Sequence, residues 1–209
     1  MSISSRHSSH SRPCHESSPC ACSCAAAQAV NTPRRRLIQI AAASLAAPLG
    51  LSATEAWSKP SDGDRLVMEE IEGAPAPLRL TDIRPGKPVL AFPFDASSKS
   101  VRDGSRLNKV VLMRFNESEL DAETRARSAG GVLAFSAICT HQGCDLKTWS
   151  SKAQLLVCFC HSSKFNLREA GKVAAGPAYR PLPMLPLKLD GEQLVIAGGF
   201  TAPPGGQLA

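Results

Sequence analysis

The sequence predicts an all-β protein built from short antiparallel strands. Among its 209 residues are 16 Pro and 15 Gly, whereas aromatic residues make up only 5%. Apolar runs alternate with Gly, Pro and Asp turn signals, which is typical of sandwiches and barrels and not of helical bundles. With 43% hydrophobic residues the chain can form a real core. We therefore expect an antiparallel β sandwich or barrel.

The strongest β run is Lys109–Phe115 (KVVLMRF), which is rich in β-branched residues. Other predicted strands are Arg65–Ile71, Leu78–Leu80 at a sheet edge, Lys87–Phe94, Val132–Ile138, Leu155–Val157 and Glu192–Ala197. Asp190-Gly191 predicts a two-residue hairpin turn of type I′. Asn116–Ser128 carries mixed charges and is interpreted as a solvated surface segment, with a partner-docking surface as the alternative.

Composition divides the chain into five segments. They are a Ser-rich n-region (1–30), an export signal or marginal anchor (31–56), a polar linker (57–64), the folded domain (65–200) and a tail (201–209). The n-region holds Cys14, Cys20, Cys22 and Cys24 near three His, so a soft-metal tail is one interpretation. A disordered n-region, or a stretch left untranslated by a start at Val30, are the others.

An export signal is indicated by Arg34-Arg35-Arg36-Leu37-Ile38 before an Ala-rich apolar run. The arginine pair, one spacer and two apolar residues resemble the twin-arginine signal that exports folded proteins. The run is interrupted by Pro48 and Gly50 and falls short of the ~20 residues that span a bilayer. We expect a periplasmic protein, with membrane attachment only if the segment is retained as an inner-membrane anchor.

The net charge of +6 does not indicate nucleic-acid binding. Residues 1–59 hold six basic and two acidic side chains, which accounts for four of the six positive charges. The remainder lacks a basic stripe interleaved with aromatics, so we expect no nucleic-acid partner.

Two short stretches carry the chemistry, Cys139-Thr140-His141-Gln142-Gly143-Cys144 and Cys158-Phe159-Cys160-His161-Ser162-Ser163. Each offers one Cys and one His, spaced C-x-H and C-x-x-H. Two Cys on one iron and two His on the other is the ligand inventory of a [2Fe–2S] centre with mixed ligation. Zinc sites more often use C-x2–4-C pairs, which disfavours zinc. Ser163 is expected to donate its hydroxyl to a cluster sulfide.

The motifs C-T-H-x-G-C and C-x-C-H-x-S resemble those of Rieske iron–sulfur proteins, over about residues 130–199. The resemblance implies the Rieske antiparallel β sandwich with a cluster subdomain of about residues 137–182 inserted in it. It implies one [2Fe–2S] cluster with the ligands Cys139, His141, Cys158 and His161. It also implies a Cys144–Cys160 disulfide and a shielding proline loop that begins at Gly176-Pro177.

Two subfamilies compete for the function, and in both the chain transfers electrons without catalysing a reaction alone. One is the small subunit of arsenite-oxidase-like enzymes, which passes electrons from a larger catalytic subunit towards a c-type cytochrome. The other is the Rieske subunit of cytochrome bc1-type complexes, which works beside cytochrome b. Gln142, where quinol-oxidising members carry an apolar residue, and the short apolar run favour the first.

Phe165 replaces a Tyr of high-potential members, which predicts an intermediate reduction potential. A Rieske oxygenase is excluded, unless its mononuclear iron sits in another chain, because every other His precedes the signal.

Overall fold

A computed structural model of the chain describes residues 59–70 and 73–206. The predicted n-region with its soft-metal alternative, and the twin-arginine signal, lie outside the described residues. Within the described ranges, no helix is both long and apolar enough to cross a membrane.

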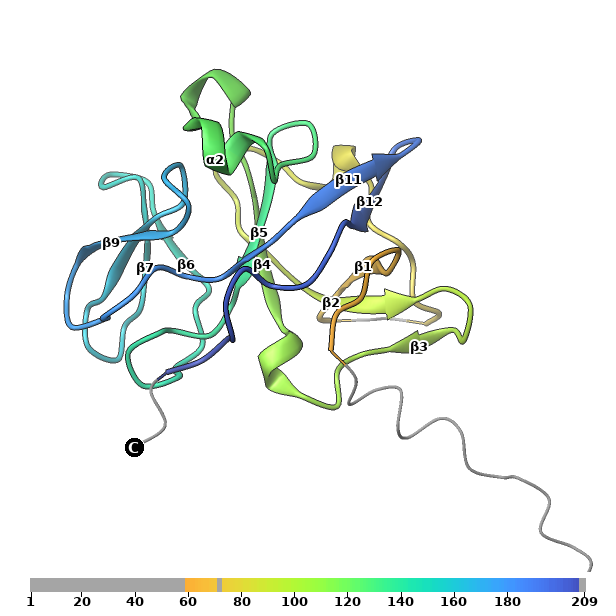
Figure 1. Cartoon of the computed structure of the whole chain (residues 1–209), viewed down its shortest axis with the longest axis horizontal. Helices are drawn as coiled ribbons and strands as arrows, with labels where there is room; N and C mark the ends of the chain where they lie inside the picture. The colour runs from red at the N-terminus through yellow and green to blue at the C-terminus, as the bar shows by residue number, and fades with distance from the viewer. Residues whose placement is uncertain (1–58, 71–72, 207–209) are drawn as a thin grey trace, which may run out of the picture. The chain divides into compact units, whose positions relative to one another are not determined.

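The described residues form two antiparallel sheets (Figure 1). The larger sheet has eight strands in the order β10-β5-β4-β2-β1-β12-β11, with β3 paired to β2. Its strands are β1 (Arg65–Met68), β2 (Val89–Asp95), β3 (Ser100–Val101), β4 (Val110–Arg114), β5 (Val132–Ser136), β10 (Met184–Leu185), β11 (Leu187–Asp190) and β12 (Gln193–Ile196). The prediction of an antiparallel β fold is confirmed.

The smaller sheet is inserted between β5 and β10 of the larger one. Its four strands follow one another in chain order: β6 (Thr148–Ser150), β7 (Leu155–Val157), β8 (Lys164–Asn166) and β9 (Lys172–Ala175). The remaining elements are single turns of helix, namely η1 (Leu80–Asp82), η2 (Arg106–Asn108), η3 (Glu117–Glu119) and α2 (Ala122–Arg125).

Strands β4 and β5 are buried on both faces, which explains their continuous apolar runs. Val111 and Met113 point into one core, whereas Val110 and Leu112 point into a second core on the opposite face. The first core also contains side chains of the smaller sheet, including Leu156 and Phe165. The small sheet is thus fixed to the large one through a shared hydrophobic core.

The segment predicted as a solvated excursion, residues 116–128, is a bridge between the two sheets. Leu120 and Thr124 are buried, and Asp121 caps α2 by accepting a hydrogen bond from the Thr124 N–H. The Asp121 N–H donates to the carbonyl of Arg168, and the Ala170 N–H donates to Thr124 Oγ1 over 2.6 Å. The prediction of a solvated surface segment is confirmed for most of these residues, which are exposed and include the helical turns η3 and α2. It missed Leu120 and Thr124, whose packing is masked by charged neighbours.

Two local predictions differ from the structure. Asp190 pairs with Gln193, so the two-residue hairpin loop is Gly191-Glu192 and not Asp190-Gly191. Gly191 has φ 59°, whereas Glu192 stays outside the left-handed region, which suits a type II′ turn with Gly first and not type I′. Leu80 begins the η1 turn, so only Arg79 of the predicted edge strand makes a bridge, to Gln193.

Candidate metal centre

The first loop of the site leaves β5 and turns sharply after Cys139. The Gly143 N–H donates to the Cys139 carbonyl over 3.0 Å, and the Cys139 N–H donates to the Cys144 carbonyl over 2.8 Å. Gly143 adopts φ 76°, a left-handed conformation that glycine takes without strain. These bonds close the turn, so Cys139 faces the core while His141 stands at the turn's tip.

The second loop joins β7 to β8 and is closed at its base. The Cys158 N–H donates to the Ser163 carbonyl over 2.8 Å, and Ser162 adopts φ 60°. Between these residues the chain projects outward, and Phe159 is 76% exposed at the tip.

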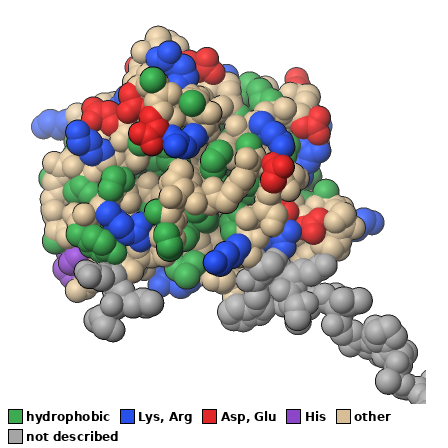
Figure 2. Space-filling view, viewed as in Figure 1, with side chains coloured by type: hydrophobic (Ala, Val, Ile, Leu, Met, Phe, Trp, Pro, Cys, Tyr) green, Lys and Arg blue, Asp and Glu red, His purple; other side chains and the backbone are tan. Residues whose placement is uncertain are grey.

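The structure brings the sequence-predicted ligands together in pairs. Cys139 and Cys158 are buried free thiols whose side chains interact with each other. The Nδ1 atoms of His141 and His161 are 3.2 Å apart, and their rings meet edge to face. Figure 2 shows histidine surface at the lower left edge of the molecule. The sulfur donors are therefore enclosed and the imidazoles accessible.

The loops are joined by a disulfide between Cys144 and Cys160, whose Cα atoms are 6.6 Å apart. The sulfurs of these two residues and of Cys158 also lie within 4.8 Å of one another, which by distance alone resembles a three-cysteine site. Bonded to each other, Cys144 and Cys160 have no thiolate to offer. The pairing leaves Cys139 and Cys158 as the available sulfur donors, the two that the motif predicts.

The proline loop covers the second cluster loop. Gly176 has φ 88°, and a Cβ at this position would lie 2.5 Å from the Cα of Ser163. The Ala178 N–H donates to Ser163 Oγ over 3.1 Å, which holds the loop in place while Pro177 stays exposed. Only glycine permits this approach of two backbones.

The Cys139 thiol lies in an environment that disfavours its charged form unless a cation is near. The pKa of Cys139 is raised to about 11; burial is the largest cause, and the neighbouring Cys158 also raises it. Hydrogen bonds from the His141 backbone and from Ser163 act in the opposite direction and lower it. The Ser163 hydroxyl is therefore directed at the sulfur of Cys139; the predicted bond to a cluster sulfide stays a prediction.

The residues present fit a cluster with mixed ligation. Two thiols and two imidazoles converge, and nitrogens bound to one metal ion at ~2.1 Å are about 3.4 Å apart at a tetrahedral angle, close to the 3.2 Å between the imidazoles. Phe165 is fully buried in the core that contains Cys139 and Cys158, and Gln142 is exposed beside His141.

Below the first loop lies a network of charges that the motif does not reveal. Asp145 accepts hydrogen bonds from Arg106 and Lys109, and Lys109 also pairs with Glu69. Partial burial alone would raise the pKa of Asp145 and lower that of Lys109. The hydrogen bonds outweigh it, so the pKa of Asp145 is below its usual value and that of Lys109 above it.

We expect Asp145→Asn to lower the free energy of unfolding by about 0.5–1 kcal/mol at pH 7, a modest value because half-exposed ion pairs are screened by solvent. A carboxyl whose folded pKa is depressed stabilises above its unfolded pKa and loses this contribution as the pH falls. The difference between the variant and the unsubstituted protein should close towards about pH 3. Urea unfolding at both pH values measures it. If the stability difference between the two proteins is as large at pH 3 as at pH 7, the effect of Asp145 is not electrostatic.

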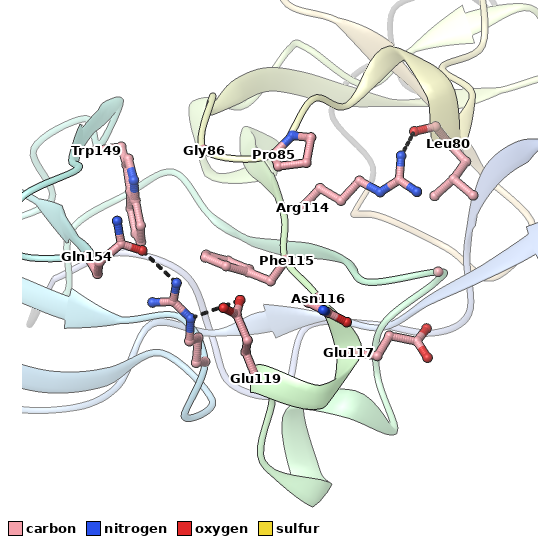
Figure 3. A pocket seen from close by; sticks show the side chains of 12 residues that line it. Leu80, Pro85, Gly86, Arg114, Phe115, Asn116, Glu117, Glu119, Trp149 and Gln154 are labelled. Carbon is pink, nitrogen blue, oxygen red and sulfur yellow. Dashed lines mark hydrogen bonds and ion pairs between the residues drawn. The ribbon is translucent and has the colours of Figure 1, made fainter.

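A groove of about 880 Å³ runs between the two sheets, and none of the predicted ligands lines it. Phe115 and Trp149, both labelled in Figure 3, line it and pack edge to face with ring centroids 5.6 Å apart. The guanidinium of Arg168 lies over the Phe115 ring, 4.5 Å from its centroid. Arg168 is neutralised by Glu119 and donates to Gln154. These contacts brace the sheets and do not form a second reactive site.

Fold and site together define a class of protein: two antiparallel sheets, the smaller of which presents two thiols and two imidazoles on adjacent loops. A family model described as "Rieske [2Fe-2S] domain" matches residues 95–186. The cytochrome bc1 complex Rieske iron-sulfur subunit of Streptomyces lividans is 31% identical over 133 residues, which are 62% of this chain and 78% of that protein. The chain belongs to the Rieske [2Fe–2S] family. As a member it is an electron-transfer protein with one [2Fe–2S] cluster.

Two further comparisons define the extent of the match. The cytochrome bc1 complex Rieske iron-sulfur subunit of Corynebacterium diphtheriae is 36% identical over 104 residues. These are 47% of this chain but 26% of that protein, so the chain spans about a quarter of this relative's length. The soluble domain of the Rieske protein II (soxF) from Sulfolobus acidocaldarius is 25% identical with a TM-score of 0.37, over 46% of this chain and 64% of that one.

Sequence reasoning missed Thr140, Tyr179 and Arg180, which lie beside the site. Thr140 is buried, and its Oγ1 donates to the carbonyl of Arg180 over 2.8 Å. Tyr179 is 51% exposed next to the proline loop. No motif marks these positions, because their roles depend on the chain returning to the first loop 40 residues later.

Proposed function

We propose that the chain is the Rieske subunit of a cytochrome bc1-type quinol–cytochrome c reductase. Its partners in this proposal are cytochrome b, where quinol is oxidised, and a c-type cytochrome that accepts the electron. The observation that carries the proposal is that both reported relatives, at 36% and 31% identity, are bc1 complex Rieske subunits. The arsenite-oxidase-like assignment, which the sequence favours at first, has no corresponding support.

The two sequence features that favour the arsenite-oxidase-like assignment, Gln142 and the short apolar run, are weak evidence for it. Gln142 is one exposed side chain on a loop tip, and its long polar group leaves the neighbouring imidazoles accessible. The short apolar run lies outside the described residues. Neither feature opposes a bc1-type role as strongly as the relatives support it.

In the proposed role, different residues of the chain hold the cluster, exchange a proton and contact the partner. When bound, the cluster supplies a one-electron carrier whose potential lies between roughly −150 and +300 mV. The buried Cys139 and Cys158 hold it against the core, while His161, exposed at the tip, presents an imidazole edge that can exchange a proton with a donor. Phe159 and Tyr179 supply apolar surface beside this edge for docking.

The experiment that tests this proposal is affinity capture of the full chain from its native membranes. We expect a cytochrome b and a c-type haem protein to be captured with it. An inhibitor of quinol oxidation should then shift the EPR spectrum of the reduced cluster in the captured complex. Capture of a molybdopterin subunit in place of the cytochromes would overturn the proposal in favour of the arsenite-oxidase-like role.

We also propose that the protein is exported to the periplasm by the twin-arginine route. The disulfide between Cys144 and Cys160 supports this, since such bonds persist in oxidising compartments. Replacing Arg34 and Arg35 by lysine keeps the charge but should block export, because the signal is read by a receptor. Fractionation should then find the precursor in the cytoplasm. Unchanged periplasmic or membrane-bound protein contradicts this route.

Phe165→Tyr is expected to raise the reduction potential. Phe165 is buried in the same core as both free thiols, and the substitution restores the Tyr that the resemblance implies for high-potential members, whose hydroxyl bonds to a ligand cysteine. A hydrogen bond that favours the reduced state by about 1 kcal/mol raises a one-electron potential by about 40 mV. Protein-film voltammetry measures the shift, with Phe94→Tyr, in a strand of the large sheet, as the control. An unchanged or lowered potential refutes the expectation.

A further inference from the structure

The C-terminal segment Thr201–Gly206 lies directly against the first cluster loop. A Cβ added at Gly206 would meet the His141 carbonyl oxygen at 2.7 Å, and the Gln142 Cα and Gly143 nitrogen both at 2.9 Å. Backbone therefore packs on backbone at the turn that carries His141. Gly206 has no left-handed φ, so what requires glycine here is the close approach and not the conformation.

Arg180 holds this segment in place. Its Nη2 donates to the carbonyl oxygens of Pro203 and Gly205, each over 2.7 Å, while Nε approaches the hydroxyl of Tyr179 at 3.2 Å. Its own carbonyl accepts the bond from Thr140 on the first loop. One residue thereby joins the proline loop, the first loop and the C-terminal segment, through bonds strengthened by the guanidinium charge.

The same turn is also fixed by Arg106. Its Nη2 donates to the Gly143 carbonyl and to Asp145, each over 2.6 Å. The turn is consequently held by two elements far away in sequence, η2 and the C-terminal segment. These contacts restrain the turn more than its two internal hydrogen bonds alone would do.

We propose that residues 201–206 form a wall of the metal centre, and that Arg180 is a positioning residue that acts through this wall on His141. The inference rests on the ligand role of His141 within the proposed function. Arg180 holds residues 201–206 against the turn. It thereby limits the movement of the His141 backbone, and this limits the orientations that the His141 imidazole can adopt. The wall also keeps water from that side of the turn.

The test uses two independent ways of loosening the wall in the full-length, cluster-loaded protein. Gly206→Val pushes the wall off the turn and leaves Arg180 intact, whereas Arg180→Gln removes the charged donor and leaves Gly206 intact. Gly199→Val is the matched control, because a Cβ there meets nothing within 4 Å. Arg180→Lys keeps the charge without the planar fork.

For both loosened variants we expect cluster loss under oxidising conditions to be at least about fivefold faster than in the control, which corresponds to about 1 kcal/mol at 25 °C. The EPR lines of the reduced cluster should broaden, because the imidazole samples more orientations. Arg180→Lys should rescue the lifetime only in part. These measurements are made well below the unfolding temperature of each variant.

The EPR line width and the cluster lifetime distinguish a positioning role of Arg180 from a general effect on the stability of the fold. If Gly206→Val matches Gly199→Val in both, the proposal is wrong, and a change confined to Arg180→Gln would then reflect lost charge alone. Should Arg180→Gln not fold, Gly206→Val decides by itself. The result is independent of which partner the protein serves, so failed capture of a cytochrome b overturns the proposed function and leaves this inference standing.

Discussion

Replacing Cys158 by serine is expected to abolish cluster binding. Cys158 is buried at the base of the second loop, a free thiol beside the disulfide, and serine offers a much harder donor at the same position. The purified variant should contain neither iron nor sulfide in stoichiometric amount and give no Rieske-type EPR signal after reduction. Iron analysis and EPR of the full chain measure this directly.

The matched control is Cys144→Ser, the same substitution at a disulfide cysteine. Here the cluster should form, because both predicted sulfur ligands remain, but the loops lose their covalent link. Closing a loop of this length stabilises by about 3 kcal/mol on chain-entropy grounds, so cluster lifetime should fall while the EPR signal persists. If the two variants behave alike, the separation of ligand and disulfide cysteines is wrong.

Asp64→Ala should cost about 2–3 kcal/mol of unfolding free energy, since it removes two charge-assisted hydrogen bonds from the buried guanidinium of Arg102, which also pairs with Asp95 over 3.4 Å. Asp64 precedes β1, and its carboxylate receives two bonds from Arg102, Nε to Oδ2 over 2.7 Å and Nη2 to Oδ1 over 2.9 Å. The exposed fractions of the two side chains are 4% and 9%. The bond fastens the first strand to the loop after β3.

Urea unfolding followed by tryptophan fluorescence measures the loss. The double variant Asp64→Leu/Arg102→Met is the control, because replacing both buried charges by apolar groups also removes the guanidinium that Asp64 solvates and should recover most of the stability. A single variant that costs less than about 1 kcal/mol would show that the pair is solvated, against its burial.

The sequence predicts the site better than the fold around it. Ligand chemistry is local: one Cys and one His per loop occupy short stretches whose spacing is visible in the sequence. Strands such as β4 are also visible, because burial on both faces leaves an unbroken apolar run. In both cases, all the residues that carry the signal lie close to one another along the chain.

The features that sequence reasoning missed depend on long-range contacts. Arg180 looks like an ordinary surface arginine until the C-terminal segment returns to it, 23 residues later. Thr124 is hidden among charged residues, yet it is buried by a strand connection more than 40 positions away. The hairpin turn moved by one residue because the register of β11 and β12 is decided by core packing of Leu187 and Leu194, and not by the Asp-Gly pair.

The bridge from α2 to the smaller sheet has a consequence for how the protein delivers electrons. Asp121 and Thr124 bond to Arg168 and Ala170, and the shared core adds Phe165 to the same junction. The two sheets therefore have no joint at which one could swing on the other. If the carrier shuttles between two partners, both sheets of the described residues must travel as one body.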